Sequence, residues 1–456
     1  MRASPRRVAF DVLHAVSVED AYANLLLPTR LRGAALTGSD AGFATELCYG
    51  TLRRRGLYDA VIEHAAGRAV DTIDAPVLDV LRLGAHQLLG MGTPPHAAVD
   101  ESVRLALALR LGRAKGFVNA VLRRVSERTE PQWTELLLAG VDDPFERFAI
   151  EHAHPRWVVA SLASALSAQN RGEELEALLA ADNVPARVSL VALPGLADAA
   201  LSAADAELSD YSPLGLRAPS GDPGADPRVR SGVVRVQDEG SQLAALALSR
   251  ARPIASGERW LDVCAGPGGK AALLAAEAAR AGAHLLASEA SPARTDLVRR
   301  ALAPLADSVS VRTADGRTLG ADPLERYDRI MLDAPCTGLG ALRRRPEARW
   351  RKSEDDVVEL AALQASLLTA ALSALSPGGV LAYVTCSPHP SETTAIVDTV
   401  LEGHPAIERL DTADLLDRVT KAPLDARAGR GAVQLWPHRH GTDAMFIQLL
   451  SRPDGA

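Results

Sequence analysis

The segment Leu332-Asp-Ala-Pro-Cys-Thr-Gly-Leu-Gly340 follows an apolar run, residues 327–333, that is typical of a buried strand. A second cysteine, in Thr385-Cys-Ser387, follows a similar run at residues 379–385. The carboxyl ends of parallel strands meet at the edge where open α/β sheets bind their ligands. We therefore expect Asp333, Cys336 and Cys386 to line one crevice.

Strands alternate with helices over the last two hundred residues or so, which predicts a doubly wound parallel sheet. Besides the two strands above, apolar runs predict strands at 259–264, 284–289, 308–313 and, at the end of the sheet, 444–450. Apolar residues at three- and four-residue spacing predict helices at 270–281, 292–302 and 354–375.

The first third of the chain shows only the helical pattern. It predicts an all-α bundle of about six helices, at 6–16, 22–31, 41–65, 75–91, 97–109 and 116–125. Between the bundle and the sheet we expect a small α/β connector, with helices at 157–166 and 173–181, a strand at 186–193 and a Pro/Gly/Asp-rich loop at 217–228. The predicted domains are residues 1–135, 136–232 and 233–453.

Composition indicates a cytoplasmic protein. The chain has 456 residues, too many for one core, and a net charge of −7, although residues 1–130 carry 17 basic against 14 acidic side chains. No apolar run has the length of a membrane span, so no membrane partner is expected. The four cysteines are scattered, a pattern that predicts neither a disulfide framework nor a paired metal-ligand motif. We expect a monomer without a metal.

The loop Leu261-Asp-Val-Cys-Ala-Gly-Pro-Gly-Gly-Lys270 joins the first predicted strand of the sheet to its first helix. Its glycines let the backbone approach a ligand closely, but neither the dinucleotide fingerprint nor the P-loop of nucleoside triphosphatases is present. Glu289 ends the next strand, where an acid can accept hydrogen bonds from ribose hydroxyls, and Asp315 follows the third strand, where it can accept from an adenine amino group. The pattern favours S-adenosylmethionine as cofactor.

Two cysteines beside an acid suit covalent chemistry on a pyrimidine. Carbon 5 of cytosine becomes nucleophilic once a thiolate adds to carbon 6, and this addition needs ring nitrogen 3 protonated or hydrogen-bonded. Asp333 fits the acid. Either Cys336 or Cys386 fits the nucleophile, and spacing does not decide between them.

Residues 342–352, which we call the basic segment, follow the first cysteine loop and contain a tryptophan, Trp350. A solvated charged turn is one interpretation; its place beside the proposed site favours contact with a phosphate backbone. The predicted RNA-binding residues are Arg343, Arg344, Arg345, Arg349 and Lys352.

Taken together, these motifs resemble the RNA 5-methylcytosine methyltransferases, and within them the Sun/RsmB subfamily that modifies 16S rRNA in the small ribosomal subunit. The resemblance covers essentially the whole chain. It rests on the three motifs quoted above, on Val236-Gln-Asp-Glu-Gly-Ser-Gln242, and on Phe117-Val-Asn-Ala-Val-Leu-Arg123 within a bundle similar to NusB. It implies a NusB-like RNA-binding bundle followed by a Rossmann-like class I methyltransferase domain.

The resemblance also implies roles for residues. Cys386 would attack the cytosine, Cys336 would assist product release, and Asp333 would be the substrate acid. The S-adenosylmethionine site would comprise Cys264, Ala265, Gly266, Pro267, Gly268, Gly269, Lys270, Glu289, Asp315 and Asp333.

The sequence departs from the family pattern in four places. Gly266 stands where alanine is usual, Ala271 where a hydroxyl residue is, and Glu289 where aspartate is commoner. Ser391-Glu392-Thr393 replaces a Glu-Glu-Asn pattern and keeps one acid. Two alternatives stay open: a tRNA cytosine methyltransferase, and a non-catalytic RNA-binding assembly or antitermination factor.

Overall fold

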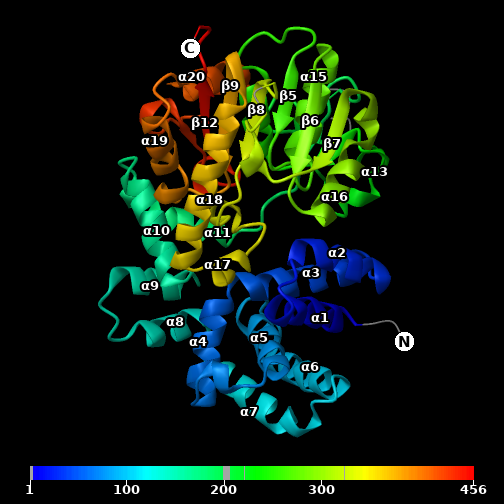
Figure 1. Ribbon diagram of the computed structural model, residues 1–456. Coiled ribbons are helices and arrows are strands. Elements are labelled where there is room, and N and C mark those ends of the chain that lie inside the picture. Colours follow the sequence, from blue (N-terminus) through cyan, green and yellow to red (C-terminus); the bar gives the residue numbers. More distant parts are fainter. Residues whose placement is uncertain (1–3, 199–205, 220, 323, 456) are drawn as a thin grey trace. The chain divides into compact units, whose positions relative to one another are not determined.

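The computed structural model describes residues 4–198, 206–219, 221–322 and 324–455 (Figure 1). The chain divides into two compact units. The helical unit comprises Met1–Ala163, Leu175–Pro185 and Leu342–Lys352, and the sheet unit comprises Ser164–Glu174, Ala186–Ala341 and Ser353–Ala456. This division splits the predicted connector and assigns the basic segment after Cys336 to the helical unit.

The helical unit contains α1 (Pro5–Val18), α2 (Ala23–Gly33), α3 (Gly38–Arg53), α4 (Arg55–Ala66), α5 (Ala75–Leu89), α6 (Pro95–Ala108), α7 (Lys115–Val125), α8 (Glu130–Leu138), α9 (Pro144–Glu151), α11 (Leu175–Asp182) and the short α17 (Ala348–Arg351). The predicted helix 41–65 is two helices, because the backbone leaves helical geometry at Arg54 (φ −100°, ψ 12°). α5 is buried along most of its length and packs against α1, α3, α4, α6 and α7. The all-α prediction is confirmed. α10 (Arg156–Ser167) crosses the boundary between the units along the chain.

The main sheet of the other unit is mixed. Its strand order is β10 (Glu408–Arg409), β12 (Phe446–Ser451), β9 (Leu375–Thr385), β8 (Tyr327–Asp333), β5 (Arg259–Asp262), β6 (His284–Glu289) and β7 (Val309–Thr313). Strands β5 to β9 are parallel, as predicted, but β12 runs antiparallel to β9 and also pairs antiparallel with β10 and β11 (Val433–Gln434). The chain order reverses between β5 and β8, so the switch point lies where their carboxyl ends meet.

Helices cover both faces of this sheet, which explains its nearly continuous apolar strands. Trp260, Met331 and Ala382 face α14 (Glu239–Ser249), α15 (Gly269–Arg280), α16 (Pro292–Leu302) and α20 (Thr412–Val419) in one core. Leu261, Leu332 and Tyr383 lie in a second core with α18 (Glu354–Ser373) and α19 (Thr394–Glu402). Figure 1 shows α15 and α16 beside β6 and β7. Among the described residues α18 alone is long and apolar enough to cross a membrane, and it packs against β8 and β9.

A small antiparallel sheet precedes the main one. Its order is β2 (Glu207–Leu208), β3 (Gly215–Arg217), β1 (Ser189–Ala192) and β4 (Val234–Val236), and a short helix, α13 (Pro227–Ser231), lies before β4. Leu190 and Leu216 are buried in its own small core. The Gln242 side chain of α14 donates to the backbone oxygen of Leu190 at 3.1 Å, which fixes the small sheet to the main domain. A last short helix, α21 (Pro437–His440), precedes β12.

Candidate active site

The two cysteine loops meet at the carboxyl edge of β8 and β9. The Sγ atoms of Cys336 and Cys386 are 3.4 Å apart. Backbone hydrogen bonds join the loops on both sides, from Ala334 N to Val384 O at 2.8 Å and from Gly340 N to Cys386 O at 2.9 Å. A side chain at Gly340 would bring its Cβ to 2.1 Å from the backbone oxygen of Ala444, so this position requires glycine.

The same edge carries an ion pair. Lys270, at the start of α15, donates to Oδ2 of Asp333 at 2.9 Å and to Oγ of Ser241 at 3.3 Å. Burial lowers the pKa of Lys270, but the charge of Asp333 and its hydrogen bond outweigh burial and raise the pKa overall. The lysine is therefore an ammonium at neutral pH. Ser241 was not among the predicted site residues, and its only signal was the motif at residues 236–242.

The two thiols have different surroundings. The hydrogen bond with Cys386, burial, and then the charges of Cys386, Glu392 and Asp333 raise the pKa of Cys336 well above its ordinary value. Cys386, in contrast, lies close enough to Lys270 to act on that ammonium. Cys336 therefore keeps its proton and can donate it to the sulfur of Cys386.

The loop between β5 and α15 is a glycine cradle. Gly266 N donates to Oε2 of Glu289 at 3.1 Å, and Gly268 has a φ of +106° that side chains rarely adopt. A Cβ on Gly266 would lie 2.4 Å from Glu289, and one on Gly268 would lie 2.4 Å from Ala301. The close approach of Glu289 gives a physical reason for glycine at 266, where the family usually has alanine. Cys264 is a protonated thiol, since burial raises its pKa.

The predicted ribose acid ends β6, the strand beside the cradle, and the predicted adenine acid follows β7, the next strand of the sheet. Glu289 is 4% exposed, and its other oxygen, Oε1, accepts from Ser291 N at 3.0 Å. Arg294 lies 3.5 Å from Glu289 and donates to the backbone oxygen of Gly266. Asp315 is partly exposed and pairs with Arg317 at 2.6 Å.

A further acid belongs to this loop. Asp262, at the end of β5, is 1% exposed, and among the described residues no side chain donates a hydrogen bond to its carboxyl. Burial, then the charge of Asp333, raises its pKa to about 8, while the charge of Lys270 and a backbone hydrogen bond from Cys264 oppose the rise. A buried acid beside a glycine cradle and a strand-ending Glu289 fits a nucleoside ligand that carries a cationic amino group, as S-adenosylmethionine does.

The basic segment lies in the helical unit, and Arg349 is buried there. Its guanidinium donates to Oδ1 of Asn183 at 2.9 Å and to backbone oxygens of Ala153 and Asp182 at 3.2 and 3.3 Å. This guanidinium is therefore not available to a phosphate, contrary to the expectation. Arg343, Arg344 and Lys352 are partly exposed, and Arg345 is exposed with its guanidinium over the ring of Tyr22. The ring of Trp350 packs against Gly56.

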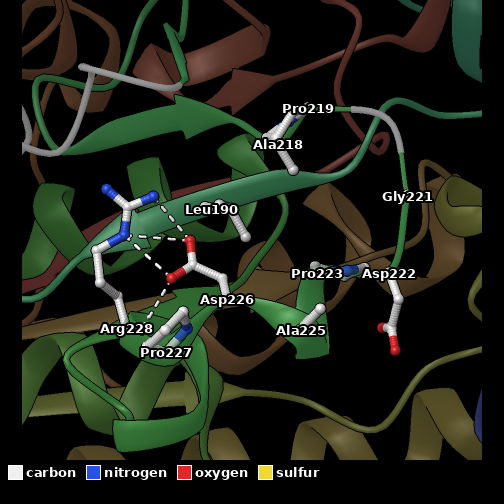
Figure 2. Close-up of a pocket in the computed structure, with 10 residues that line it drawn as sticks. All are labelled: Leu190, Ala218, Pro219, Gly221, Asp222, Pro223, Ala225, Asp226, Pro227 and Arg228. Atoms are coloured by element: carbon white, nitrogen blue, oxygen red, sulfur yellow. Dashed lines mark hydrogen bonds and ion pairs between the residues drawn. The ribbon is translucent and has the colours of Figure 1, made fainter.

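A hollow of about 540 Å³ lies elsewhere, beside the small sheet (Figure 2). Its polar groups include Asp222 and the pair formed by Asp226 and Arg228, whose guanidinium donates to Asp226 at 2.7 Å. None of the predicted site residues lines it. Among the described residues no cluster of histidine, cysteine and acidic side chains could hold a metal ion.

A Rossmann-like sheet with a glycine cradle after its first strand and an acid ending the next binds a nucleoside cofactor, and the family matches place this chain among the class I methyltransferases, which use S-adenosylmethionine. Residues 252–451 match the family model of the 16S rRNA methyltransferases RsmB/F, and residues 3–127 match the NusB family. The chain belongs to the RsmB/F family of S-adenosylmethionine-dependent RNA methyltransferases.

Curated relatives match over the whole chain. The "Putative methyltransferase Rv1407" of Mycobacterium tuberculosis is 49% identical, with 98% of this chain and 96% of that protein covered. Ribosomal RNA small subunit methyltransferase B of Pseudomonas putida is 34% identical, with 98% of each covered.

Solved structures share the fold. The crystal structure of PH0851 matches with a TM-score of 0.80 and 21% identity over 99% of both chains. NSun6 from Pyrococcus horikoshii with SFG, an analogue of S-adenosylmethionine, matches with a TM-score of 0.53 and 17% identity over 63% of this chain and 97% of its own.

Proposed function

We propose that this protein methylates carbon 5 of a cytosine in 16S rRNA of the small ribosomal subunit, in the cytoplasm, through a covalent bond to Cys386. The observation that carries the proposal is the 3.4 Å contact between the two thiols at the sheet edge that also holds the Lys270–Asp333 pair. The relatives named for small-subunit rRNA support the substrate. The exposed Arg345, with Arg343, Arg344 and Lys352, is proposed to contact the phosphate backbone.

Binding of the cofactor is assigned to residues 264–270 with Glu289, Asp315 and Asp333, and to Asp262. Glu289 is held by two backbone N–H groups, which fix its carboxylate toward the cradle. When bound, the cofactor supplies the methyl group. The chain's own residues activate the base and release it.

Activation begins at Cys386. Its sulfur forms a bond to carbon 6 of the cytosine, and the electron pair of the 5,6 double bond is delocalised toward nitrogen 3. The Lys270 ammonium is the proton source: through its hydrogen bond to Asp333 it supplies a proton that passes by way of that carboxyl to nitrogen 3 as the negative charge develops there. Carbon 5 thereby gains enamine character and attacks the methyl group.

Release reverses the addition. The proton on carbon 5 leaves to solvent, its electron pair re-forms the 5,6 double bond, and the carbon–sulfur bond breaks. Nitrogen 3 returns its proton to the Lys270–Asp333 pair. Cys336, still protonated, donates a hydrogen bond to the departing thiolate of Cys386. The raised pKa of Cys336 supports this division of roles between the two cysteines.

Methyl transfer from labelled S-adenosylmethionine tests the proposal. Purified protein, small-subunit rRNA and, in parallel, small ribosomal particles and tRNA are incubated with the cofactor, and the RNA is digested to nucleosides. We expect label in 5-methylcytidine from one small-subunit site, none with Cys386→Ser, and full activity with Cys48→Ala, whose thiol is buried in the helical unit. Label in tRNA alone, or in another nucleoside, contradicts the proposal.

A further inference from the structure

We propose that Glu392 is a positioning residue that holds the Cys336 loop and the Cys386 loop at their working separation. The inference rests on the proposed function for its consequence in catalysis, and on the geometry of the sheet unit for its structural part. Glu392 lies after β9, in a 3₁₀ turn between the Cys386 loop and α19, and its side chain is fully buried.

Both carboxylate oxygens of Glu392 bind the residue that follows Cys336. Thr337 donates its backbone N–H to Oε1 at 2.8 Å and its hydroxyl to Oε2 at 2.5 Å. The Nε2 group of Gln364, on α18, donates to Oε1 at 3.2 Å and to the backbone oxygen of Pro335 at 2.8 Å. The Glu392 carboxylate thus holds the residue after Cys336, and the Gln364 amide holds the residue before it.

The same network reaches the second loop. Oγ of Ser387, the residue after Cys386, lies 3.1 Å from Oγ1 of Thr337. The hydroxyl of Tyr383, on β9, donates to the backbone oxygen of Glu392 at 2.8 Å and lies 3.2 Å from Oε1 of Gln364. The residues following both cysteines are therefore linked to each other, and Glu392 anchors the link to β9. A buried acid with this many donors is rigid, because each lost contact would leave a desolvated polar group.

The charge of Glu392 adds an electrostatic effect to the geometric one. Cys386, Glu392, Asp333 and Tyr383 are the ionisable groups that act on Cys336. The carboxylate of Glu392 opposes ionisation of Cys336 and so helps to keep a proton on that thiol. Glu392→Gln keeps the size of the side chain and one acceptor but removes the charge. Thr337→Val leaves the charge of Glu392 in place and removes the hydroxyl contacts of Thr337 to Glu392 and Ser387.

Alkylation of the two thiols tests the inference without RNA. The full-length protein is treated with iodoacetamide across a pH series, and peptide mass spectrometry follows Cys336 and Cys386 separately. We expect the labelling midpoint of Cys336 to move to lower pH in Glu392→Gln and to stay in place in Thr337→Val. Glu402→Gln, a change at an exposed acid on α19, is the matched control and should leave the midpoint unchanged.

Steady-state methylation supplies the second readout. Both Glu392→Gln and Thr337→Val should lower kcat by about tenfold to 10²-fold, as expected when reacting groups shift by up to 1 Å, while the KM for S-adenosylmethionine is kept. An unshifted Cys336 midpoint in Glu392→Gln, or an unchanged kcat in both variants, overturns the inference. If the wild-type protein does not methylate cytosine but the midpoint still shifts, the proposed function fails and the placement of Glu392 stands.

Discussion

Asp262 should make the stability of this protein fall as the pH rises. Its pKa is raised from an ordinary 3.8 to about 8 because the carboxyl is buried and lies near Asp333. The folded protein therefore keeps a proton that the unfolded chain releases above pH 3.8. The contribution of Asp262 to stability is complete below that pH and is lost as the pH rises through about 8.

The magnitude follows from the shift. One pKa unit corresponds to about 1.4 kcal/mol, so the full shift of about four units is worth roughly 6 kcal/mol. Between pH 5.5 and pH 8.5 the folded state should lose about 3 kcal/mol through this group. Asp262→Asn cannot ionise and should lack that loss, while its constant cost from an imperfectly paired amide cancels in the comparison between the two pH values.

Urea unfolding at pH 5.5 and 8.5 provides the assay, with tryptophan fluorescence as the signal. We expect the difference in unfolding free energy between wild type and Asp262→Asn to change by about 3 kcal/mol between the two pH values. Asp296→Asn, at an exposed site on α16, is the control and should follow wild type. Parallel pH profiles for wild type and Asp262→Asn would refute the reasoning.

Three further predictions concern other parts of the site. Gly340→Ala should destabilise the fold by about 1–3 kcal/mol by overpacking against the Ala444 backbone, whereas Gly429→Ala, with open space around it, should change unfolding little; equal effects would contradict the packing argument. Asp333→Asn should lower the free energy of unfolding by about 3–5 kcal/mol because it leaves the buried Lys270 ammonium without its counter-charge. Lys270→Met should lower it less because Asp333 is 28% exposed, and urea titrations that give the reverse order would contradict this. Arg349→Met should lower the free energy of unfolding by about 3 kcal/mol because its buried hydrogen bonds are lost. Arg345→Gln should leave the free energy of unfolding unchanged and reduce the salt dependence of RNA binding by about one phosphate contact. If filter binding shows the loss of a phosphate contact in Arg349→Met and not in Arg345→Gln, Arg349 contacts RNA and the reasoning is wrong.

Much of the fold could be predicted because the strands are buried on both faces. The ranges of β6 and β8 agree with the predicted ones, since apolar runs of six and seven residues are too short for a helix and have the length of a buried strand. The break at Arg54 between α3 and α4 was not predicted, because none of Arg53, Arg54 and Arg55 is a residue type that usually ends a helix. The small sheet was predicted as one strand, since β2 and β3 have two and three residues and show no periodicity.

The candidate site was predictable where the chemistry depends on residues that end strands. Asp333, Cys336 and Cys386 end neighbouring strands or follow them directly, so the parallel order brings them together. Arg349 was predicted to bind RNA because it lies in a run of basic residues. Such a run does not show which of its guanidinium groups is buried. The family pattern at residues 391–393 draws attention to the acid Glu392, but it does not show that this acid contacts Thr337, 55 residues earlier in the chain.

The central claim is that Cys386, and not Cys336, bonds to the base. The direct test uses Cys336→Ala with S-adenosylmethionine and small-subunit rRNA, followed by denaturation, nuclease digestion and mass spectrometry of the adduct. The account predicts a peptide in which a methylated cytosine is joined to Cys386, and no adduct in Cys386→Ala. An adduct on Cys336 in Cys386→Ala, with none in Cys336→Ala, would contradict it.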